Sequence, residues 1–344
     1  MITVGIIGAT GYVGVELLRL LINHKKIKVA SISSTSFEGE SIAKVYVNMR
    51  KSTSLECTLP DEVLAASQVV FAALPHGLSE DIAEKCIKSN KICIDLGADF
   101  RLESEKEYIR WYGKSFDKPS IHPLSIYGLP ELNREKIRYS PIIANPGCYP
   151  TSIELGLMPA LKEKLIDTKG IIIDSKSGVT GAGRTLSEST HFPACNENMS
   201  PYKIGTHRHT PEIEQTLSKI AGESVSITFV PHLIPVNRGI LSTIYCSMDK
   251  TYDIEKIYEV YVNYYENEPF VRVLDIGSAA CLRNVKYSNF CDISIHVDDR
   301  TNTLIIASAL DNMVKGAAGQ AIQNMNIALG FEETEGLEYI PPAF

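Results

Sequence analysis

Short apolar runs separated by helical repeats mark the first half of the chain. The run at residues 2–7 leads into a glycine-rich turn, after which apolar side chains recur at helical spacing, and a second run at 27–33 completes a strand–helix–strand unit. Further strands are predicted at 69–74, 91–96 and 141–145, with a helix at 79–90. Because these strands are apolar throughout, the pattern favours a parallel sheet covered on both faces.

The pattern changes after residue 148. A helix at 151–164 and a strand at 170–177 precede a polar, glycine-rich stretch at 178–209. Long strand-like runs then follow one another with few helices between them, at 224–232, 240–248, 291–297 and 303–309. The spacing predicts a second α+β domain with a mainly antiparallel sheet.

The predicted architecture is therefore α/β, a Rossmann-type doubly wound parallel sheet followed by the α+β domain. We assign residues 1–147 to a dinucleotide-binding domain and residues 148–312 to a catalytic, substrate-binding and oligomerisation domain. A C-terminal helix within 313–344, with small residues on one side, is expected to pack back on the first domain. A length of 344 residues fits two domains.

Composition narrows the class of protein. The net charge is -7 without a basic block, which argues against nucleic-acid binding, and no apolar run approaches the ~18 residues of a membrane span. The N-terminus looks like a first strand and not a signal peptide, so we expect a cytoplasmic protein. The eight cysteines contain no C-x-x-C pair, and His191 with Cys195 does not complete a zinc site, so no metal is expected.

The glycine turn is the first candidate site. A turn of this kind brings backbone N–H groups and a helix N-terminus to a pyrophosphate, and it comprises Gly8, Thr10, Gly11, Tyr12, Val13 and Gly14. At the end of the second strand, where a carboxylate would bind the ribose of NAD, the residues are Ser33 and Ser34. Hydroxyls there leave room for a 2′-phosphate, which favours NADP(H) over NAD.

Cys148 is the candidate nucleophile. It lies in NPGCYPTS, where Pro150 suits the first turn of a helix and Thr151 with Glu154 looks like a capping pair. The sulfur should then lie at or just before a helix N-terminus, whose partial positive charge stabilises a thiolate. A buried structural cysteine is the alternative interpretation.

The polar stretch supplies candidate partners for the thiol. His207 and His209 flank Arg208 just before a probable helix, and could provide a general acid/base and an anion contact. Polar residues that merely precede a helix on the surface are the alternative.

Eight motifs follow one another along the chain. They are the glycine turn, ADFR (98–101), YGLPE (127–131), ANPGCYPTS (144–152), SGVTGAGR (177–184), HRHTPE (207–212), FVPHLIPVNRGIL (229–241) and DNMVKGAAGQAIQNMN (311–326). Together they resemble the N-acetyl-gamma-glutamyl-phosphate reductase family of arginine biosynthesis. The resemblance covers nearly the whole chain. It implies NADPH-dependent reduction of an acyl phosphate through a Cys148 thioester, with His209 as acid/base and His207 close by.

The resemblance also implies further contacts. Cofactor contacts are expected at Pro75, Ser177, Gly178 and Asn312, and substrate contacts at Arg101, Arg184 and Arg208. A small-molecule substrate and a homo-oligomer, dimer or tetramer, are expected. One position departs from the family, because Thr35 stands where many members carry an arginine that can meet the 2′-phosphate.

Other activities remain open at this point. An acyl-phosphate reductase of lysine biosynthesis or an enzyme like aspartate-semialdehyde dehydrogenase would use the same parts. A catalytically silent NADP-binding sensor would not need the cysteine, histidine and arginines together. A thiol hydrolase would not need the dinucleotide turn.

Overall fold

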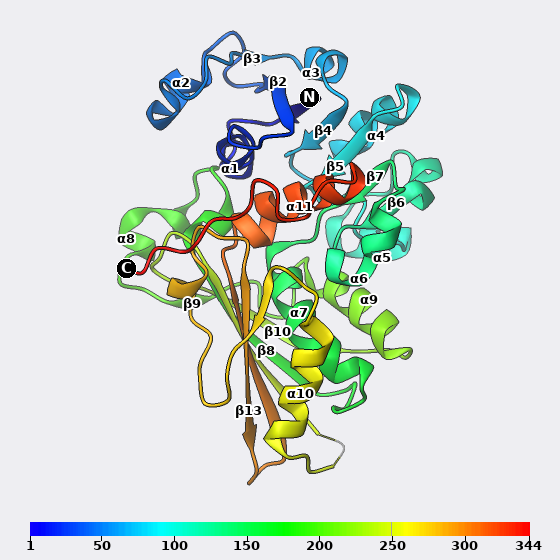
Figure 1. Cartoon of the computed structure of the whole chain (residues 1–344), viewed down its shortest axis with the longest axis vertical. Helices are drawn as coiled ribbons and strands as arrows, with labels where there is room; N and C mark the ends of the chain where they lie inside the picture. The colour runs from blue at the N-terminus through cyan, green and yellow to red at the C-terminus, as the bar shows by residue number, and fades with distance from the viewer. Residues whose placement is uncertain (249) are drawn as a thin grey trace. The chain divides into compact units, whose positions relative to one another are not determined.

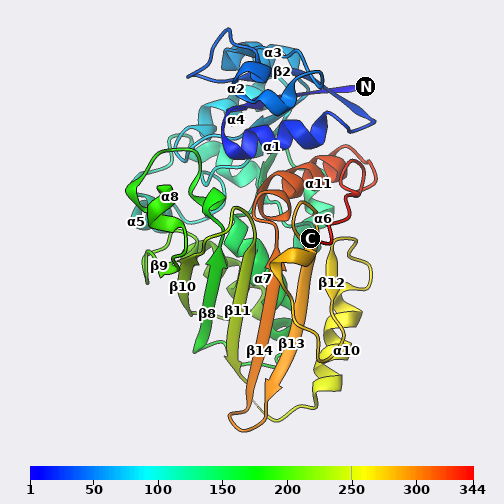
Figure 2. The ribbon, with the colours of Figure 1, turned by 90° about the vertical axis from the view of Figure 1, so that its left-hand side faces the viewer.

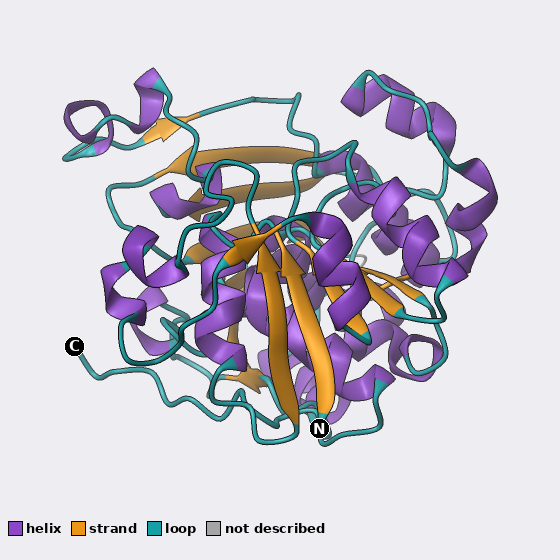
Figure 3. Ribbon diagram, turned by 90° about the horizontal axis from the view of Figure 1, so that it is seen from above, coloured by secondary structure: helices purple, strands orange, loops and turns teal. Residues whose placement is uncertain are grey.

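The computed structural model describes residues 1–248 and 250–344. Contacts within the chain define two compact units. The first contains Met1–Gly147 and Ala317–Glu338, and the second contains Cys148–Gly316 and Tyr339–Phe344. Figure 1 colours the chain from blue to red along the sequence, and Figure 3 distinguishes helices from strands.

A seven-stranded sheet forms the centre of the first unit. All its neighbouring strands are parallel, in the order β3-β2-β1-β4-β5-β7-β6, which confirms the predicted parallel sheet. The strands are β1 (Ile2–Ile7), β2 (Ile27–Ser33), β3 (Cys57–Thr58), β4 (Val69–Ala72), β5 (Ile92–Asp95), β6 (Ser125–Tyr127) and β7 (Ile142–Ala144). The helices are α1 (Tyr12–Leu21), α2 (Ile42–Val45), α3 (Pro60–Ala66), α4 (Ser79–Lys88), α5 (Glu105–Tyr112), α6 (Pro130–Ile137) and α11 (Gly319–Ala328).

Strand β1 occupies the point where the order of the sheet reverses. The chain moves from β1 through β2 to β3 on one side and through β4 to β5 on the other. In sheets of this type, ligands bind beyond the carboxyl ends of the strands at this reversal. The glycine turn follows β1 directly and therefore lies at that place.

Helix α11 is part of the first unit although it is far from the other helices in sequence. All nine residues from Gly319 to Ile327 are buried. Asn324 donates hydrogen bonds to the Gly128 carbonyl (2.8 Å) and to the Asn145 side chain (3.1 Å). The helix is shorter than the predicted span of 313–344, because Gly330 adopts a left-handed conformation (φ 67°) that ends it.

A second seven-stranded sheet forms the centre of the second unit (Figure 2). Its order is β12-β13-β14-β11-β8-β10-β9, with β10 parallel to β8, β12 parallel to β13 and the other pairs antiparallel. This confirms the predicted mainly antiparallel sheet. The strands are β8 (Ile171–Ser177), β9 (Ser200–Pro201), β10 (Ile227–Leu233), β11 (Ile240–Ser247), β12 (Val271–Val273), β13 (Cys291–Asp298) and β14 (Thr303–Leu310).

Three helices pack on one face of this sheet, namely α7 (Cys148–Lys162), α9 (Thr210–Ala221) and α10 (Ile254–Tyr265), and α7 contacts α9, α10 and the central strands β11 and β14. The four-residue helix α8 (Phe192–Cys195) lies in the segment between β8 and β9. Short 3₁₀ helices are η1 (Val47–Met49) and η2 (Pro119–Leu124) in the first unit, and η3 (Val179–Ala182), η4 (Glu188–Thr190) and η5 (Leu282–Asn284) in the second. A π-helical turn, η6 (Val314–Ala318), precedes α11. Within the described residues, no helix is long and apolar enough to cross a membrane.

Candidate active site

Cys148 is the first residue of α7, as the sequence predicts. Amide groups in the first turn of a helix have no partner within the helix, so partial positive charge is concentrated beside this side chain. The cysteine is half-buried. A Cβ at Gly316 would lie 2.9 Å from the Cβ of Cys148, so the backbone at 316 touches the cysteine directly. The thiol is held in one place by helix geometry and close packing.

The predicted cap of this helix is wrong. Thr151 and Glu154 are fully buried inside α7, which begins three residues before Thr151. Pro150 explains the difference, because a proline is tolerated at any position of the first turn, where its missing N–H is not needed.

Serine hydroxyls fix the first part of α7 on the sheet. Ser152, one turn after Cys148, donates to Ser242 (3.0 Å) and lies within hydrogen-bond distance of Ser308 (3.2 Å), while Ser175 donates to Ser242 (2.8 Å). All four side chains are buried. Hydrogen bonds in a dry interface define the position of the helix more strictly than apolar contacts alone.

Aromatic and histidine rings surround the start of α7. Tyr149 makes edge-to-face contacts with His207, His209 and Phe229, at centroid distances of 5.5, 6.0 and 5.2 Å. The rings of the two histidines are 4.8 Å apart. The structure thus brings Cys148 and both predicted histidines to one place, which we call the thiol–histidine cluster (Cys148, Tyr149, Tyr202, His207 and His209).

His207 is held in its neutral form. Burial, with the charges of Lys203 and Arg208 as smaller causes, lowers its pKa to about 3. Its Nδ1 accepts a hydrogen bond from the backbone N–H of His209 (3.1 Å), which is possible only when that nitrogen carries no proton. His207 therefore orients the next histidine and does not exchange protons near neutral pH.

His209 lies at the N-terminus of α9, where it precedes Thr210. Its backbone is fixed from both sides, because its N–H bonds to His207 and its carbonyl accepts from Ile213 (3.0 Å). The imidazole faces Tyr149 and His207. It is the second histidine of the cluster, and the hydrogen bond from its own backbone N–H ties it to the ring of the first.

Two tyrosines near the thiol escaped the sequence analysis. The hydroxyl groups of Tyr149 and Tyr202 are 3.0 Å apart. Burial raises the pKa of both, that of Tyr202 to about 12, and negative charge on Cys148 adds to the effect. A signal was present in the sequence, since Tyr202 precedes the His207 motif by five residues in an otherwise polar stretch.

The predicted arginines have different surroundings. Arg208 is half-buried beside His207, and its charge adds to burial in lowering the pKa of both His207 and Lys203. Arg184 is exposed in the polar stretch. Arg101 belongs to the first unit, is buried, and donates to the carbonyls of Asn145 (2.9 Å) and Leu96 (3.1 Å).

The glycine turn in the first unit is as tight as the motif requires. Gly8 has a φ of 87°, and a Cβ there would lie 2.4 Å from the Ala73 carbonyl oxygen. A Cβ at Gly14 would lie 2.2 Å from the Gly8 oxygen, whereas one at Gly11 would approach nothing closer than 3.5 Å. Gly8 and Gly14 are therefore needed for packing, and Gly11 leaves the helix start open.

Hydroxyl groups line the same turn. Thr10 and Ser34 share a hydrogen bond of 2.6 Å, and the Ser33 carbonyl accepts from the N–H groups of Gly8 and Ala9. Thr35 is exposed, as are Tyr12 and Pro75, and Val13 is half-buried. These residues at the end of β2 and in the glycine turn therefore present hydroxyl groups, and none of them carries a carboxylate.

Three other predicted cofactor residues lie together in the second unit. Asn312 accepts from the Gly239 N–H (2.7 Å) and donates to the Thr180 hydroxyl (3.0 Å). A Cβ at Gly178 would lie 2.7 Å from the Arg238 nitrogen, and Ser177 is buried next to it. Asn312 thus ties two loops together. No group of three His, Cys, Asp or Glu side chains suited to a metal occurs within the described residues.

Comparison with known families matches both parts of the chain. Residues 3–140 match the family described as the NAD-binding domain of semialdehyde dehydrogenase, and residues 148–312 match its dimerisation domain. Aspartate semialdehyde dehydrogenase II of Vibrio cholerae has the same fold, with a TM-score of 0.74 at 17% identity over 96% of this chain and 98% of that one. The fold and the thiol–histidine cluster thus define an oxidoreductase of the semialdehyde dehydrogenase class.

Sequence relatives narrow this class. Proteins named N-acetyl-gamma-glutamyl-phosphate reductase from two Clostridium botulinum strains are 61% and 62% identical to this chain over 344 residues, with all of each chain covered. One from Brachyspira hyodysenteriae is 55% identical, also over both full lengths. The chain belongs to the N-acetyl-gamma-glutamyl-phosphate reductase family, which confirms the resemblance seen in its motifs.

The neutral state of His207 predicts a pH effect on stability. Below about pH 6.5 the unfolded chain protonates this histidine, whereas the folded protein leaves it neutral down to about pH 3. The unfolded state then binds more protons, so this histidine lowers the free energy of unfolding as the pH falls. His207→Asn removes that loss and keeps an acceptor for the His209 N–H.

Urea unfolding at pH 7, 6 and 5 measures the effect. We expect the wild type to lose stability relative to His207→Asn by up to about 1.4 kcal/mol per pH unit below pH 6.5. His191→Asn, at an exposed histidine, should parallel the wild type. Identical pH slopes for His207→Asn and the wild type would contradict a neutral His207.

Proposed function

We propose that the protein reduces N-acetyl-L-glutamyl 5-phosphate to N-acetyl-L-glutamate 5-semialdehyde with NADPH, releasing phosphate, as a step of arginine biosynthesis. The observation that carries the proposal is Cys148 at the start of α7, directly before Tyr149, whose ring contacts His209, in a chain whose full-length relatives bear this enzyme's name. A thiol nucleophile with an adjacent acid/base is what acyl transfer to sulfur followed by reduction requires.

The first step forms a thioester. The Cys148 thiolate attacks the acyl carbon, the C–O bond to phosphate breaks, and phosphate leaves with its electron pair. We assign stabilisation of the oxyanion of the tetrahedral intermediate to backbone N–H groups in the first turn of α7, because backbone donors of this kind lower the barrier.

The second step reduces the thioester. Bound NADPH supplies a hydride, which is its one chemical contribution. The carbonyl oxygen takes up the displaced electron pair, and we assign its protonation to His209, since His207 stays neutral. When the thiohemiacetal collapses, the C–S bond breaks, Cys148 leaves as thiolate and His209 takes the hydroxyl proton, which frees the semialdehyde.

The residues of the first unit fit a phosphorylated dinucleotide. The open start of α1 at Gly11 suits a pyrophosphate, and the Thr10–Ser34 hydroxyl pair suits the ribose side. We also assign cofactor contacts to other residues of the first unit, namely Gly8, Tyr12, Val13, Gly14, Ser33 and Pro75. In the second unit we assign them to Ser177, Gly178 and Asn312. Among the arginines, we assign Arg208 first to the anionic group of the substrate, because it lies close to His207 of the thiol–histidine cluster. Arg184 and Arg101 are further candidates.

We also propose how the chain associates. Ile172, Tyr245 and Ile305 lie side by side on β8, β11 and β14, and Ile172 and Tyr245 are 49% and 38% exposed. The sheet's other face is covered by α7 (Figure 1). The matched family domain is one described as a dimerisation domain, so we assign this exposed apolar row to contact with a second copy.

A cytoplasmic location completes the proposal. All eight cysteines are free thiols, which is typical of proteins kept in a reducing compartment.

Cys148→Ser tests covalent catalysis. We expect the variant to bind NADPH as the wild type does and to lose reductase activity by about a thousandfold or more, because a hydroxyl is a far weaker nucleophile near neutral pH. Calorimetry and NADPH oxidation measure the two properties. Cys291→Ser, at a buried thiol of the second unit outside the thiol–histidine cluster, is the control and should stay active. Substantial turnover by Cys148→Ser would rule the thioester out.

His209→Ala tests the proton donor. Phosphate is already a good leaving group, so the variant should slow hydride transfer by about 10²–10⁴-fold and acylation by less. Single-turnover experiments that record phosphate release and NADPH oxidation separately distinguish the steps. Equal slowing of both would mean that His209 mainly activates Cys148, and no slowing would refute the assignment.

Ser34→Asp tests the cofactor preference. A carboxylate at this position repels a 2′-phosphate and can bind the ribose hydroxyls of NADH instead. The wild type should favour NADPH by at least about tenfold in kcat/KM, equivalent to 1.4 kcal/mol, and the variant should reverse the order. Ser36→Asp, at an exposed serine two residues on, is the control. Comparable wild-type efficiency with NADH would defeat the claim.

Ile172→Glu tests the association surface. A charge in the middle of the apolar row should convert the oligomer to monomers in sedimentation velocity experiments. The control is Val262→Glu. This valine belongs to α10, a helix on the other side of the sheet from the apolar row, and is 37% exposed, so the variant should leave the oligomer intact. An unchanged sedimentation coefficient in the Ile172 variant would place the contact elsewhere.

A further inference from the structure

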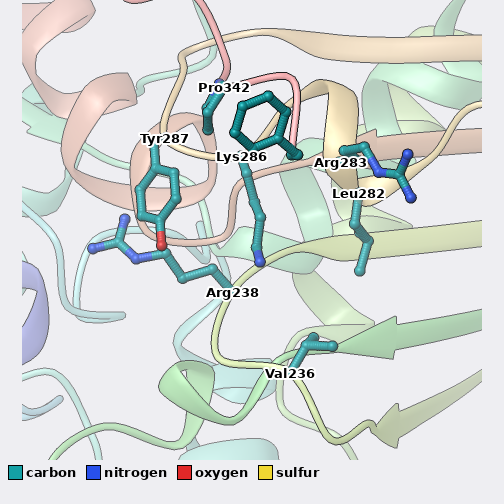
Figure 4. Close-up of a pocket in the computed structure, with 8 residues that line it drawn as sticks. Val236, Arg238, Leu282, Arg283, Lys286, Tyr287 and Pro342 are labelled. Atoms are coloured by element: carbon teal, nitrogen blue, oxygen red, sulfur yellow. The ribbon is translucent and has the colours of Figure 1, made fainter.

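A cavity of about 320 Å³ opens in the second unit, and no residue of the thiol–histidine cluster is among those that line it (Figure 4). Its volume is at the lower end of the range for small-molecule sites. Three separate segments line it, namely the β10–β11 loop, the segment between β12 and β13, and the last residues of the chain. The lining residues are Val236, Arg238, Leu282, Arg283, Lys286, Tyr287, Pro342 and Phe344.

Positive charge dominates the cavity. Arg238, Arg283 and Lys286 contribute three cationic groups, and none of the lining side chains is acidic. Arg238 lies 3.6 Å from the buried Asp311 carboxylate. Neither Arg283 nor Lys286 forms an ion pair with a described residue, so two positive charges in the cavity are not balanced locally.

Apolar surface accompanies the charge. The Arg238 guanidinium lies 5.1 Å from the centre of the Tyr287 ring, which holds its planar group against the wall. Leu282, Val236 and Pro342 complete the lining. Flat guanidinium groups and an ammonium group beside apolar walls suit an organic anion with more than one acidic group.

Asp311 connects the cavity to Cys148. One carboxylate oxygen accepts from the Tyr287 N–H (2.7 Å), next to Arg238, while the other accepts from Met313 (2.8 Å) and Val314. The Asp311 carbonyl accepts from the Gly316 N–H (2.9 Å), and Gly316 is the residue whose backbone touches Cys148. A ligand that draws Arg238 away from Asp311 therefore acts on the backbone that positions the thiol.

We propose that this cavity is a regulatory binding site for a small polyanion carrying carboxylate or phosphate groups, and that its occupation lowers reductase activity through Arg238 and Asp311. Citrate and inorganic pyrophosphate serve as probes for the two chemistries. In this site Arg283 and Lys286 bind the polyanion, and they take no part in the reduction itself.

The binding experiment compares two double variants of equal charge change. Arg283→Gln with Lys286→Gln removes the cavity's unbalanced charges, and Lys169→Gln with Lys256→Gln removes two exposed charges elsewhere in the second unit. Calorimetry is done at constant ionic strength on NADPH-saturated Cys148→Ser protein carrying each pair. We expect at least one probe to bind the protein with an intact cavity. Replacing Arg283 and Lys286 should weaken its binding by at least about tenfold, whereas replacing Lys169 and Lys256 should leave it unchanged.

The kinetic experiment uses the same pairs in the active enzyme. The bound probe should lower kcat for NADPH oxidation in the wild type and in the Lys169/Lys256 variant, without competing with the acyl phosphate, and should have no effect on the cavity variant. Absence of binding by both probes would overturn the proposal. So would binding that survives the cavity substitutions, or inhibition that is purely competitive with substrate.

Discussion

The direct contact between Gly316 and Cys148 is the constraint on which the site depends. The residue that carries the thiol cannot shift toward the chain that follows β14, because a single methyl group at 316 would already be too close. On its other side the thiol is fixed by the start of α7, and the buried serines hold that helix on the sheet. One narrow fit therefore sets the position of the nucleophile relative to the histidines.

Burial also sets the charges around the thiol. Tyr149, Tyr202 and His207 all keep their neutral forms near neutral pH, since each would have to ionise in a dry environment. Arg208 lies beside the cluster, and its positive charge adds to burial in lowering the pKa of His207 and Lys203. Neutral side chains around the thiol, with this cation next to them, favour the approach of an anionic substrate.

Much of the fold followed from the sequence because its signals were local. Continuous apolar strands and the turn from Gly8 to Gly14 defined the parallel sheet, and Pro150 located the start of α7. The signals failed where tertiary packing decided the outcome. Helix α10 is rich in tyrosine and valine, residues typical of strands, yet it forms because Ile257, Tyr261 and Tyr265 fit one buried face. Tyr202 was missed because its position before the His207 motif does not by itself show that its hydroxyl lies beside that of Tyr149.

Helix α7 is both the carrier of Cys148 and part of the core, with every residue from Tyr149 to Leu161 buried. Segments of this kind exchange their amide hydrogens only when the whole structure opens. The nucleophile is therefore mounted on the least labile part of its unit, in contrast to enzymes whose reactive groups lie on mobile loops. Heating should then abolish the active geometry and the fold together, with no range of temperature in which an intact core carries a loosened thiol.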